Sequence, residues 1–293
     1  MISRLNSIVI FAVGAVFAAP ATRAAESYDG CAGFISSLPV TITTQGVWCL
    51  DRDLSTSNSA GPAVTIATNN VTVDCNGFKI GGLGAGPGTA AVGVSAMTRR
   101  NVSVRHCNIR GFRHGIAIEG LAGSGHVIED NQLEGNTQEG IRVFGETSTV
   151  RGNRVLDTGG TTSATYFIAG IHVGGTVDVE DNLVGGMAGT PDEDIFIYGI
   201  LSENRGHVVR NQVRELVPSG TEGPGSAAGI ALIGADFILV ERNEVDGVVG
   251  SDSSRPIYCS TSSRVQVRDN LMVSYPNGLG VDCNDLGGNV YVP

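Results

Sequence analysis

One short pattern recurs eight times along the chain: an apolar residue, two mostly polar residues, Asn, any residue and a second apolar residue. The copies begin at Val73, Val104, Ile128, Val150, Val179, Val208, Val240 and Val267. Only the copy at Val104 departs from the pattern, because Cys107 stands in place of Asn. A pattern that returns every roughly 20–50 residues indicates an architecture of stacked repeats.

A second pattern, Gly-Ile within an apolar alternation, follows each copy of the first. The clear versions are Gly115-Ile116, Gly140-Ile141, Gly170-Ile171, Gly199-Ile200 and Gly229-Ile230, and the weaker ones are Gly93-Val94, Pro256-Ile257 and Gly278-Leu279. Alternation with a period of two predicts short strands, and the intervening Gly, Asn and Asp predict turns. One such coil has too little apolar surface to fold alone, so we expect neighbouring coils to stack around a continuous apolar column.

The recurrent Asn has two physical explanations. Asn tolerates left-handed backbone geometry at a tight turn. Its side-chain amide can also bond to the same amide one coil away and form a ladder. Because strands of successive coils would pair in parallel about 4.8 Å apart, we expect Asn131, Asn153 and Asn182 to lie directly above one another. The sequence therefore predicts an all-β, single-domain parallel β-helix of about eight coils.

Residues 1–24 have the features of a secretory signal peptide. Arg4 precedes an apolar run over 8–19, and small residues follow it. Cleavage after Ala21 or Ala24 fits this pattern, and the run is too short for a membrane helix, although a retained anchor is the alternative. We therefore expect a secreted or periplasmic protein that is not an integral membrane protein.

An open end of a β-helix exposes its core and unpaired strand edges, so it needs a cap. We assign residues 25–63 to an N-terminal cap and residues 64–293 to the β-helix domain. Six cysteines in an exported chain point to disulfides, and six cysteines allow 15 pairings in principle. Cysteines near equivalent points of neighbouring coils would lie within bonding range. The predicted pairs are Cys31–Cys49, Cys75–Cys107 and Cys259–Cys283.

The charge of the chain limits its partners. The formal net charge is −10, and removal of Arg4 and Arg23 with the signal peptide makes it −12, since two positive charges are lost. Such a surface repels phosphate backbones, so we expect no nucleic-acid partner. Only one lysine, Lys79, occurs in the chain.

The coils from Ile128-Glu-Asp-Asn-Gln-Leu133 to Gly140-Ile-Arg-Val143 resemble the parallel β-helix repeat of the pectate lyase-like superfamily. They are also similar to the repeats of NosD-type periplasmic proteins. The resemblance covers roughly residues 64–292 and implies a right-handed helix. It says little about activity, because many unrelated functions use this scaffold.

Loops of variable length separate the two patterns at one corner. The long ones are 81–90, 156–168, 185–197 and 214–227, and three of them are consecutive, so we expect a wall beside the Gly-Ile strands. The resemblance implies that such loops border a saccharide groove. Asp192, Glu193 and Asp194 on the third long loop are candidate Ca²⁺ ligands, with a solvated acidic loop as the alternative.

Alternation also places two rows of side chains on the outer face of the Gly-Ile strands. One row is Ala117, Arg142, His172, Leu201, Ala231 and Tyr258, and the other is Glu119, Phe144, Gly174, Glu203, Ile233, Ser260 and Asp282. Candidate catalytic residues in these rows are Arg142, His172, Glu203 and Tyr258. Candidate substrate-binding residues are Glu119, Phe144 and Asp194.

A lyase acting on a uronic acid needs a base and a positive group that stabilises the enolate, and Arg142 or His172 could serve. A hydrolase needs two carboxylates, and Glu203 with Asp194 is the best pair. Two departures weaken the family parallel: the Gly-Ile strands carry no lysine, and the aspartate signatures of polygalacturonases are absent. An ion pair between Arg142 and Glu119 one coil away is the structural alternative.

Two function classes remain open from the sequence. The first is a secreted protein that binds or processes extracellular polysaccharide, as a lyase, epimerase or hydrolase in the groove. The second is a non-catalytic surface, adhesion or structural β-helix protein. We expect a polysaccharide partner, although a protein of the second class could instead present a rigid rod to another partner. We also expect a monomer and no firmly required cofactor apart from a candidate Ca²⁺.

Overall fold

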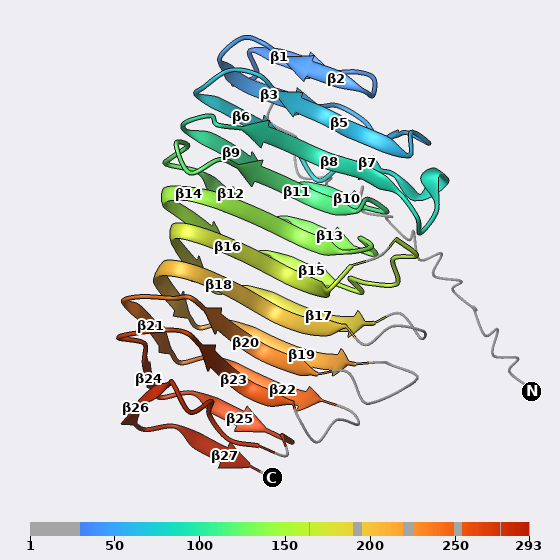
Figure 1. The fold of residues 1–293 in the computed structure, drawn as a ribbon. Coiled ribbons are helices and arrows are strands. Elements are labelled where there is room, and N and C mark those ends of the chain that lie inside the picture. Colours follow the sequence, from blue (N-terminus) through green and yellow to red (C-terminus); the bar gives the residue numbers. More distant parts are fainter. Residues whose placement is uncertain are drawn as a thin grey trace, which may run out of the picture.

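The computed structural model describes residues 30–163, 165–189, 195–218, 226–248, 254–275 and 277–292. Over these residues the chain winds into a solenoid of stacked coils, with the first strands at one end and the last at the other (Figure 1). The signal peptide predicted over 1–24 lies outside the described residues. Within them, no helix is long and apolar enough to cross a membrane.

The strands form two parallel sheets. The larger sheet holds β1 (Gly33–Ile35), β2 (Val40–Ile42), β3 (Gly46–Leu50), β5 (Ala60–Ile66), β6 (Val71–Asp74), β8 (Ala90–Met97), β9 (Val102–Arg105), β11 (His114–Glu119), β12 (Val127–Glu129), β14 (Glu139–Arg151), β16 (Phe167–Glu180), β18 (Phe196–Val209), β20 (Ala227–Ile233), β21 (Ile238–Glu241), β23 (Arg255–Ser260), β24 (Gln266–Arg268) and β26 (Asn284–Gly287).

The smaller sheet follows the Asn pattern. It holds β4 (Leu54–Ser55), β7 (Lys79–Gly81), β10 (Asn108–Arg110), β13 (Gln132–Glu134), β15 (Arg154–Leu156), β17 (Leu183–Ala188), β19 (Gln212–Val217), β22 (Glu244–Val248), β25 (Leu271–Val273) and β27 (Val290–Val292), with one 3₁₀ turn, η1 (Leu83–Ala85), after β7. The eight Asn patterns each lead into one strand of this sheet, and β4 and β27 add one strand at each end. The predicted fold class, an all-β parallel β-helix, is confirmed.

The coil pairing begins before the expected boundary at residue 64. β2 pairs with β5, β3 pairs with β6 and β4 pairs with β7, all in parallel. The segment assigned to a cap over 25–63 therefore contributes strands to the same sheets as the repeats. The physical reason is that Val40, Ile42 and Leu50 alternate inward like the later strands, although they lack the Asn pattern.

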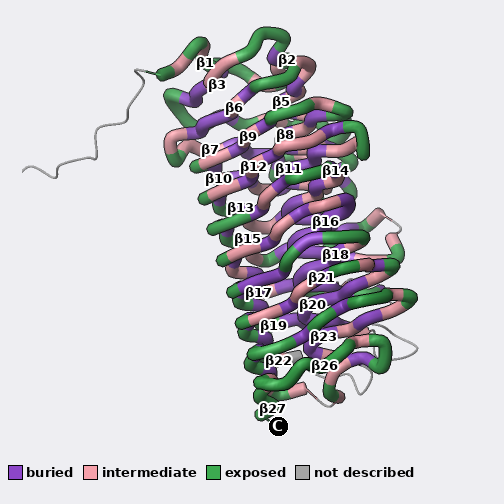
Figure 2. Tube along the Cα trace, turned by 90° about the vertical axis from the view of Figure 1, so that its left-hand side faces the viewer, coloured by how far each residue is buried: buried purple, intermediate pink, exposed green. Residues whose placement is uncertain are grey.

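The core is a column of Val, Ile and Leu side chains enclosed by the two sheets. Figure 2 marks the buried residues along successive coils. The Gly of each Gly-Ile pair belongs to this packing. A Cβ on Gly140, Gly170 or Gly199 would lie 2.3 Å from a valine methyl carbon of the smaller sheet. Gly and Ile therefore both face inward, and only Gly leaves room for the valine opposite.

The predicted asparagine ladder is present. The amide nitrogen of Asn153 donates to Oδ1 of Asn182 at 3.0 Å, and Asn182 donates in the same way to Asn211. Each amide also donates to a backbone carbonyl of the preceding coil, as Asn182 does to Val150. The remaining ladder bonds link Asn131 to Asn153, Asn211 to Asn243, Asn243 to Asn270 and Asn270 to Asn289.

The other explanation offered for the recurrent Asn holds for Asn76, whose φ is 50°, but is wrong for the ladder residues. The left-handed backbone lies at the residue before each of them: φ is 53° at Asp130, 65° at Gly152 and 56° at Asp181. The ladder Asn that follows each of these residues is not among those with positive φ. The turn is made by the preceding residue, and the Asn is needed for its amide.

All three predicted disulfides are present: Cys31–Cys49, Cys75–Cys107 and Cys259–Cys283. Cys107 stands at the ladder position, since its backbone N–H donates to Oδ1 of Asn131 at 3.0 Å. The disulfide with Cys75 thus covers the first end of the asparagine ladder.

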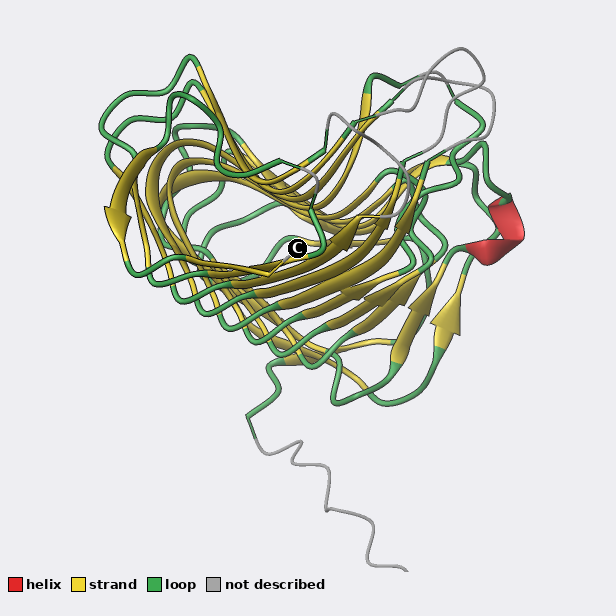
Figure 3. Cartoon of the chain, turned by 90° about the horizontal axis from the view of Figure 1, so that it is seen from below, coloured by secondary structure: helices red, strands yellow, loops and turns green. Residues whose placement is uncertain are grey.

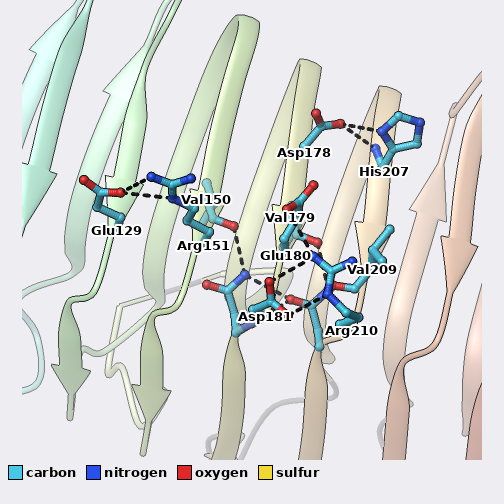
Figure 4. Close-up of polar contacts among 12 residues, drawn as sticks. Glu129, Val150, Arg151, Asp178, Val179, Glu180, Asp181, His207, Val209 and Arg210 are labelled. Atoms are coloured by element: carbon cyan, nitrogen blue, oxygen red, sulfur yellow. Dashed lines mark hydrogen bonds and ion pairs between the residues drawn. The ribbon is translucent and has the colours of Figure 1, made fainter.

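Opposite charges on neighbouring coils face one another on the outside of the larger sheet (Figure 4). Arg151 bonds Glu129 at 2.6 Å, and Arg210 bonds Asp181 at 2.8 Å. Because each pair joins neighbouring coils, a register shift would separate the partners. Such exposed pairs contribute little stability individually but favour one register.

The Gly-Ile segments of the larger sheet form a curved layer (Figure 3). Seen along the solenoid axis, its outer side is concave, and loops rise at its edges. Loops 81–90 and 156–168 meet at one edge, where the N–H of Thr162 donates to the carbonyl of Pro87 at 3.4 Å. We call the outer side of β11, β14, β16, β18, β20 and β23 the concave face.

Candidate functional site

The concave face carries the side-chain rows expected from the alternation. In the first row, Arg142 pairs with His172, His172 with Leu201, and Ala231 with Tyr258. In the second row, Phe144 pairs with Gly174, and Gly174 with Glu203. Arg142, His172, Phe144 and Glu203 therefore lie together on three consecutive coils.

A buried carboxylate, Glu139, lies at the centre of this group and was not predicted. Its side chain is fully buried. Oε1 lies 2.8 Å from Nδ1 of His172, and Oε2 lies 2.7 Å from Nδ1 of His114. A guanidinium nitrogen of Arg142 donates to the same carboxylate at 3.2 Å. Three cationic or potentially cationic side chains thus surround one buried anion.

The mutual interactions of Glu139 and His172 favour the ionised carboxylate and the protonated imidazole. Burial opposes ionisation of Glu139, but hydrogen bonds and charge from His114 and His172 outweigh it and hold the pKa of Glu139 well below its usual range. Burial likewise opposes protonation of His172, but Glu139 and Glu203 outweigh it and raise the pKa of His172. Each partner stabilises the charged form of the other.

Glu203 is the exposed end of this network. His172 Nε2 lies 3.3 Å from Oε1 of Glu203, whose side chain is 37% exposed, while the His172 side chain is only 5% exposed. The rings of Phe144 and Phe167 meet the imidazole edge-on, at centroid distances of 4.9 and 5.4 Å. The imidazole is therefore fixed, and the Glu203 carboxylate is the group within reach of a ligand.

Arg142 is held by its neighbours. It lies 2.6 Å from Glu119 one coil away and 3.2 Å from Glu139, and its guanidinium lies 4.9 Å from the centroid of the Phe144 ring. The ion pair with Glu119, which the sequence left as the structural alternative, is formed. Glu119 and Phe144 therefore contact Arg142 before any ligand is bound.

Tyr258 does not join this group. It lies three coils beyond His172 in the same row, which is about 14 Å at a strand spacing of about 4.8 Å. It lines a separate pocket with Phe196, Tyr198 and Arg255. The sequence placed Tyr258 on the correct face but did not show how far along the face it lies.

The acidic triplet Asp192, Glu193 and Asp194 lies outside the described residues, so its role as a Ca²⁺ site stays a prediction. Among the residues that the structure does describe, no group of three His, Cys, Asp or Glu side chains is arranged to hold a metal ion. The Glu203–Asp194 pair considered for hydrolysis likewise stays a prediction.

Glu139 and His114 were missed because the Gly-Ile strands were interpreted as a strict alternation. Gly and Ile both face inward, so the residue before Gly faces outward, as His114 and Glu139 do. The register aligns His114 with Glu139, and Glu139 with Ala169. The residues before each Gly therefore form a third outward row. The sequence signal for this row is the pair of consecutive inward residues, Gly and Ile.

The fold is shared with proteins of known structure. The enzymatically active domain of tailspike protein 2 from bacteriophage CBA120 superposes with a TM-score of 0.57 at 13% identity, over 90% of this chain and 41% of that chain. A Thermotoga maritima exopolygalacturonase gives 0.44 at 8% identity, over 89% and 84%. Pectate lyase Pel9A gives 0.45 at 12% identity, over 87% and 68%.

The similarity to the tailspike domain concerns the fold alone, and the chain spans about two fifths of the tailspike chain. A search of curated proteins finds no sequence match. The family described as a right handed beta helix region matches residues 40–213, which is more than half of the 293 residues. The predicted handedness and the resemblance to β-helix proteins are thereby confirmed, and the chain belongs to the right-handed β-helix family.

Proposed function

We propose that this protein binds an extracellular polysaccharide along the concave face and transfers protons to or from it through Glu203. The observation that carries the proposal is the buried Glu139 carboxylate, which fixes His172 beside Glu203. Burying an ionised carboxylate is costly unless it is paired. A scaffold role would be served equally by an apolar residue, as the small Ala169 and Ala228 show at equivalent points of later coils.

The roles of the three groups follow from their exposure. Glu203 reaches the surface, so it is the candidate catalytic residue. His172 is a positioning residue, because it bonds Glu203 through Nε2 and is itself fixed by Glu139 through Nδ1. With both ring nitrogens protonated, His172 donates to both carboxylates. This arrangement fixes the orientation of the Glu203 carboxylate, and an ionised carboxylate is a group that accepts a proton.

Further observations support an extracellular carbohydrate role without deciding the reaction. Three disulfides suit an oxidising compartment. The tailspike domain that shares the fold is described as enzymatically active. The concave face also presents aromatic rings, such as Phe196, which is 50% exposed.

Binding without catalysis is the second candidate, and one observation favours it. The Arg142 guanidinium is engaged by Glu119 and Glu139. A lyase needs a free positive group to stabilise the developing enolate, and Arg142 would first have to leave its partners. In the second candidate function, the concave face binds the polysaccharide but no proton is transferred to or from it.

The test uses purified protein on pectate, alginate and glycosaminoglycans, with and without Ca²⁺. Binding is followed by calorimetry, and turnover by unsaturated-product absorbance and reducing-sugar release. We expect Glu203→Gln to lower turnover at least about 100-fold, the scale of general acid–base catalysis, with little change in binding. Glu129→Gln is the matched control, since Glu129 pairs with Arg151 away from the concave face.

Three outcomes separate the candidates. Turnover that depends on Glu203 supports the acid–base centre. Binding without any product supports the second candidate. Absence of binding to every polysaccharide in the panel contradicts both.

A further inference from the structure

A pocket on the concave face lies away from Glu203, at the strands β18, β20 and β23. Its volume is about 120 Å³, and its lining includes Phe196, Tyr198, Ala228, Arg255 and Tyr258. Tyr198, Ala228 and Arg255 are aligned on three consecutive coils. The pocket therefore belongs to the same face as the acid–base group but uses different side chains.

The pocket exists because a small residue stands between two large ones. Ala228 separates Tyr198 on the preceding coil from Arg255 on the following coil. Two coil steps span about 9.6 Å, which leaves room for one sugar ring above the Ala228 methyl group. Ala231 repeats this arrangement between Leu201 and Tyr258 in the adjacent row.

Aromatic rings form one side of the pocket. The rings of Phe196 and Tyr198 are stacked, with centroids 6.1 Å apart and planes 2° apart. Phe196 is 50% exposed, so its ring offers an apolar surface to a ligand, whereas Tyr198 is only 8% exposed. Burial and the nearby Tyr258 raise the pKa of Tyr198 to about 12, so its phenol stays neutral at physiological pH.

The opposite side carries a positive charge that no described carboxylate neutralises. One guanidinium nitrogen of Arg255 makes two long bonds, of 3.4 Å each, to the carbonyls of Gly278 and Leu279. Within the described part of the chain, Arg255 forms no ion pair, unlike Arg142, Arg151, Arg210, Arg264 and Arg268. In a chain of net charge −10, an arginine that has no acidic partner among the described residues is available to an anionic ligand.

We propose that this pocket binds one pyranose unit bearing an anionic group, with the anion on Arg255 and the ring against Phe196. The apolar face of a sugar ring suits an aromatic side chain, and the guanidinium fork suits a carboxylate. The Tyr258 phenol supplies a donor and acceptor for a ring hydroxyl. This inference rests on the proposed function, because it states that one sugar unit of the proposed polysaccharide ligand is anionic.

The test compares methyl glucuronide with methyl glucoside, two probes that differ at the carboxylate. Titration of each is followed by NMR chemical shifts on the full chain. We expect the wild-type protein to prefer the glucuronide by about tenfold, as one charge-assisted hydrogen-bond contact implies. Arg255→Gln should abolish this preference, while Phe196→Ala should weaken both probes.

Arg154→Gln is the matched control, since Arg154 is exposed on β15 of the other sheet, and thermal unfolding verifies that each variant is folded. Tyr258→Phe is a milder variant that keeps the ring and should weaken both probes. An unchanged preference in folded Arg255→Gln, or no saturable glucuronide binding, would overturn the inference. Either result is separable from failure of the proposed function, which is measured on polysaccharides through Glu203.

Discussion

Two buried ionisable side chains, Glu139 and His126, have opposite charge states: the first is ionised and the second is neutral near pH 7. Glu139 is ionised because His114, His172 and Arg142 surround it. His126 is 1% exposed, and among the described residues its Nδ1 atom has no hydrogen-bond partner. Burial alone lowers the pKa of His126 to about 4. Glu139 lies on the concave face with its partners, whereas His126 makes the stability of the protein sensitive to acid.

His126 makes the stability depend on pH between about 6.5 and 4. In the unfolded chain His126 binds a proton near the ordinary histidine pKa of 6.5, and in the folded protein only near pH 4. The unfolded state therefore holds more protons in this interval, so the free energy of unfolding falls as the pH falls, by up to about 3 kcal/mol. Urea unfolding at a series of pH values should show this slope in the wild type.

His126→Gln should remove the slope between pH 6.5 and 4, whatever its effect on absolute stability. Glu139 acts in a lower window, because its pKa is depressed from 4.5 and its stabilisation is lost only as the pH falls below that value. The elevated pKa of His172 acts in the opposite direction, and its stabilisation is lost as the pH rises above 6.5. An identical slope in His126→Gln would show that another group titrates there.

The asparagine ladder is the element that links successive coils at one turn. Oδ1 of Asn182 accepts from the backbone and the amide of Asn153, and its amide donates to Val150 and Asn211. All of these groups are buried. We therefore expect Asn182→Ala to lower the free energy of unfolding by on the order of 3–5 kcal/mol, since several polar groups lose their partners at once.

Chemical denaturation of Asn182→Ala and of Asn58→Ala checks this expectation. Asn58 is an exposed loop residue outside the ladder, so its substitution should change stability by no more than about 0.5 kcal/mol. Equal, small losses in both variants would mean that the ladder contributes no more than an ordinary surface turn.

For strands and turns, the repeat predicted the positions of the elements well, but it did not predict the backbone conformation of single residues. Spacing and alternation located the strands, the ladder and the disulfides Cys75–Cys107 and Cys259–Cys283, because each depends on equivalent positions in neighbouring coils. They did not reveal which of two consecutive polar residues takes the left-handed turn, since Asp181 and Asn182 are both suited to it. They also missed Glu139, because strict alternation does not anticipate two inward residues such as Gly140 and Ile141.

For the whole molecule, the predictable part is the scaffold and the less predictable part is the site on it. Every coil repeats the same inward packing, so the concave face follows from the register of Arg142, His172 and Leu201. The loops at its edges carry no periodicity, and the pocket at Tyr198 and Arg255 depends on which outward residues are small. The ion network and the pocket therefore emerge only when side chains of different coils are placed in space.

In the proposed function, the buried Glu139 keeps His172 cationic on the concave face. An NMR titration of the His172 ring in wild type and Glu139→Gln, with and without the panel polysaccharide that binds most tightly, tests it directly. We predict a His172 pKa above 6.5 in the wild type, a lower value in Glu139→Gln, and ring signals that shift on saturation with saccharide while those of His126 do not. An ordinary His172 pKa in the wild type, or His172 signals unmoved by bound saccharide, would contradict the account.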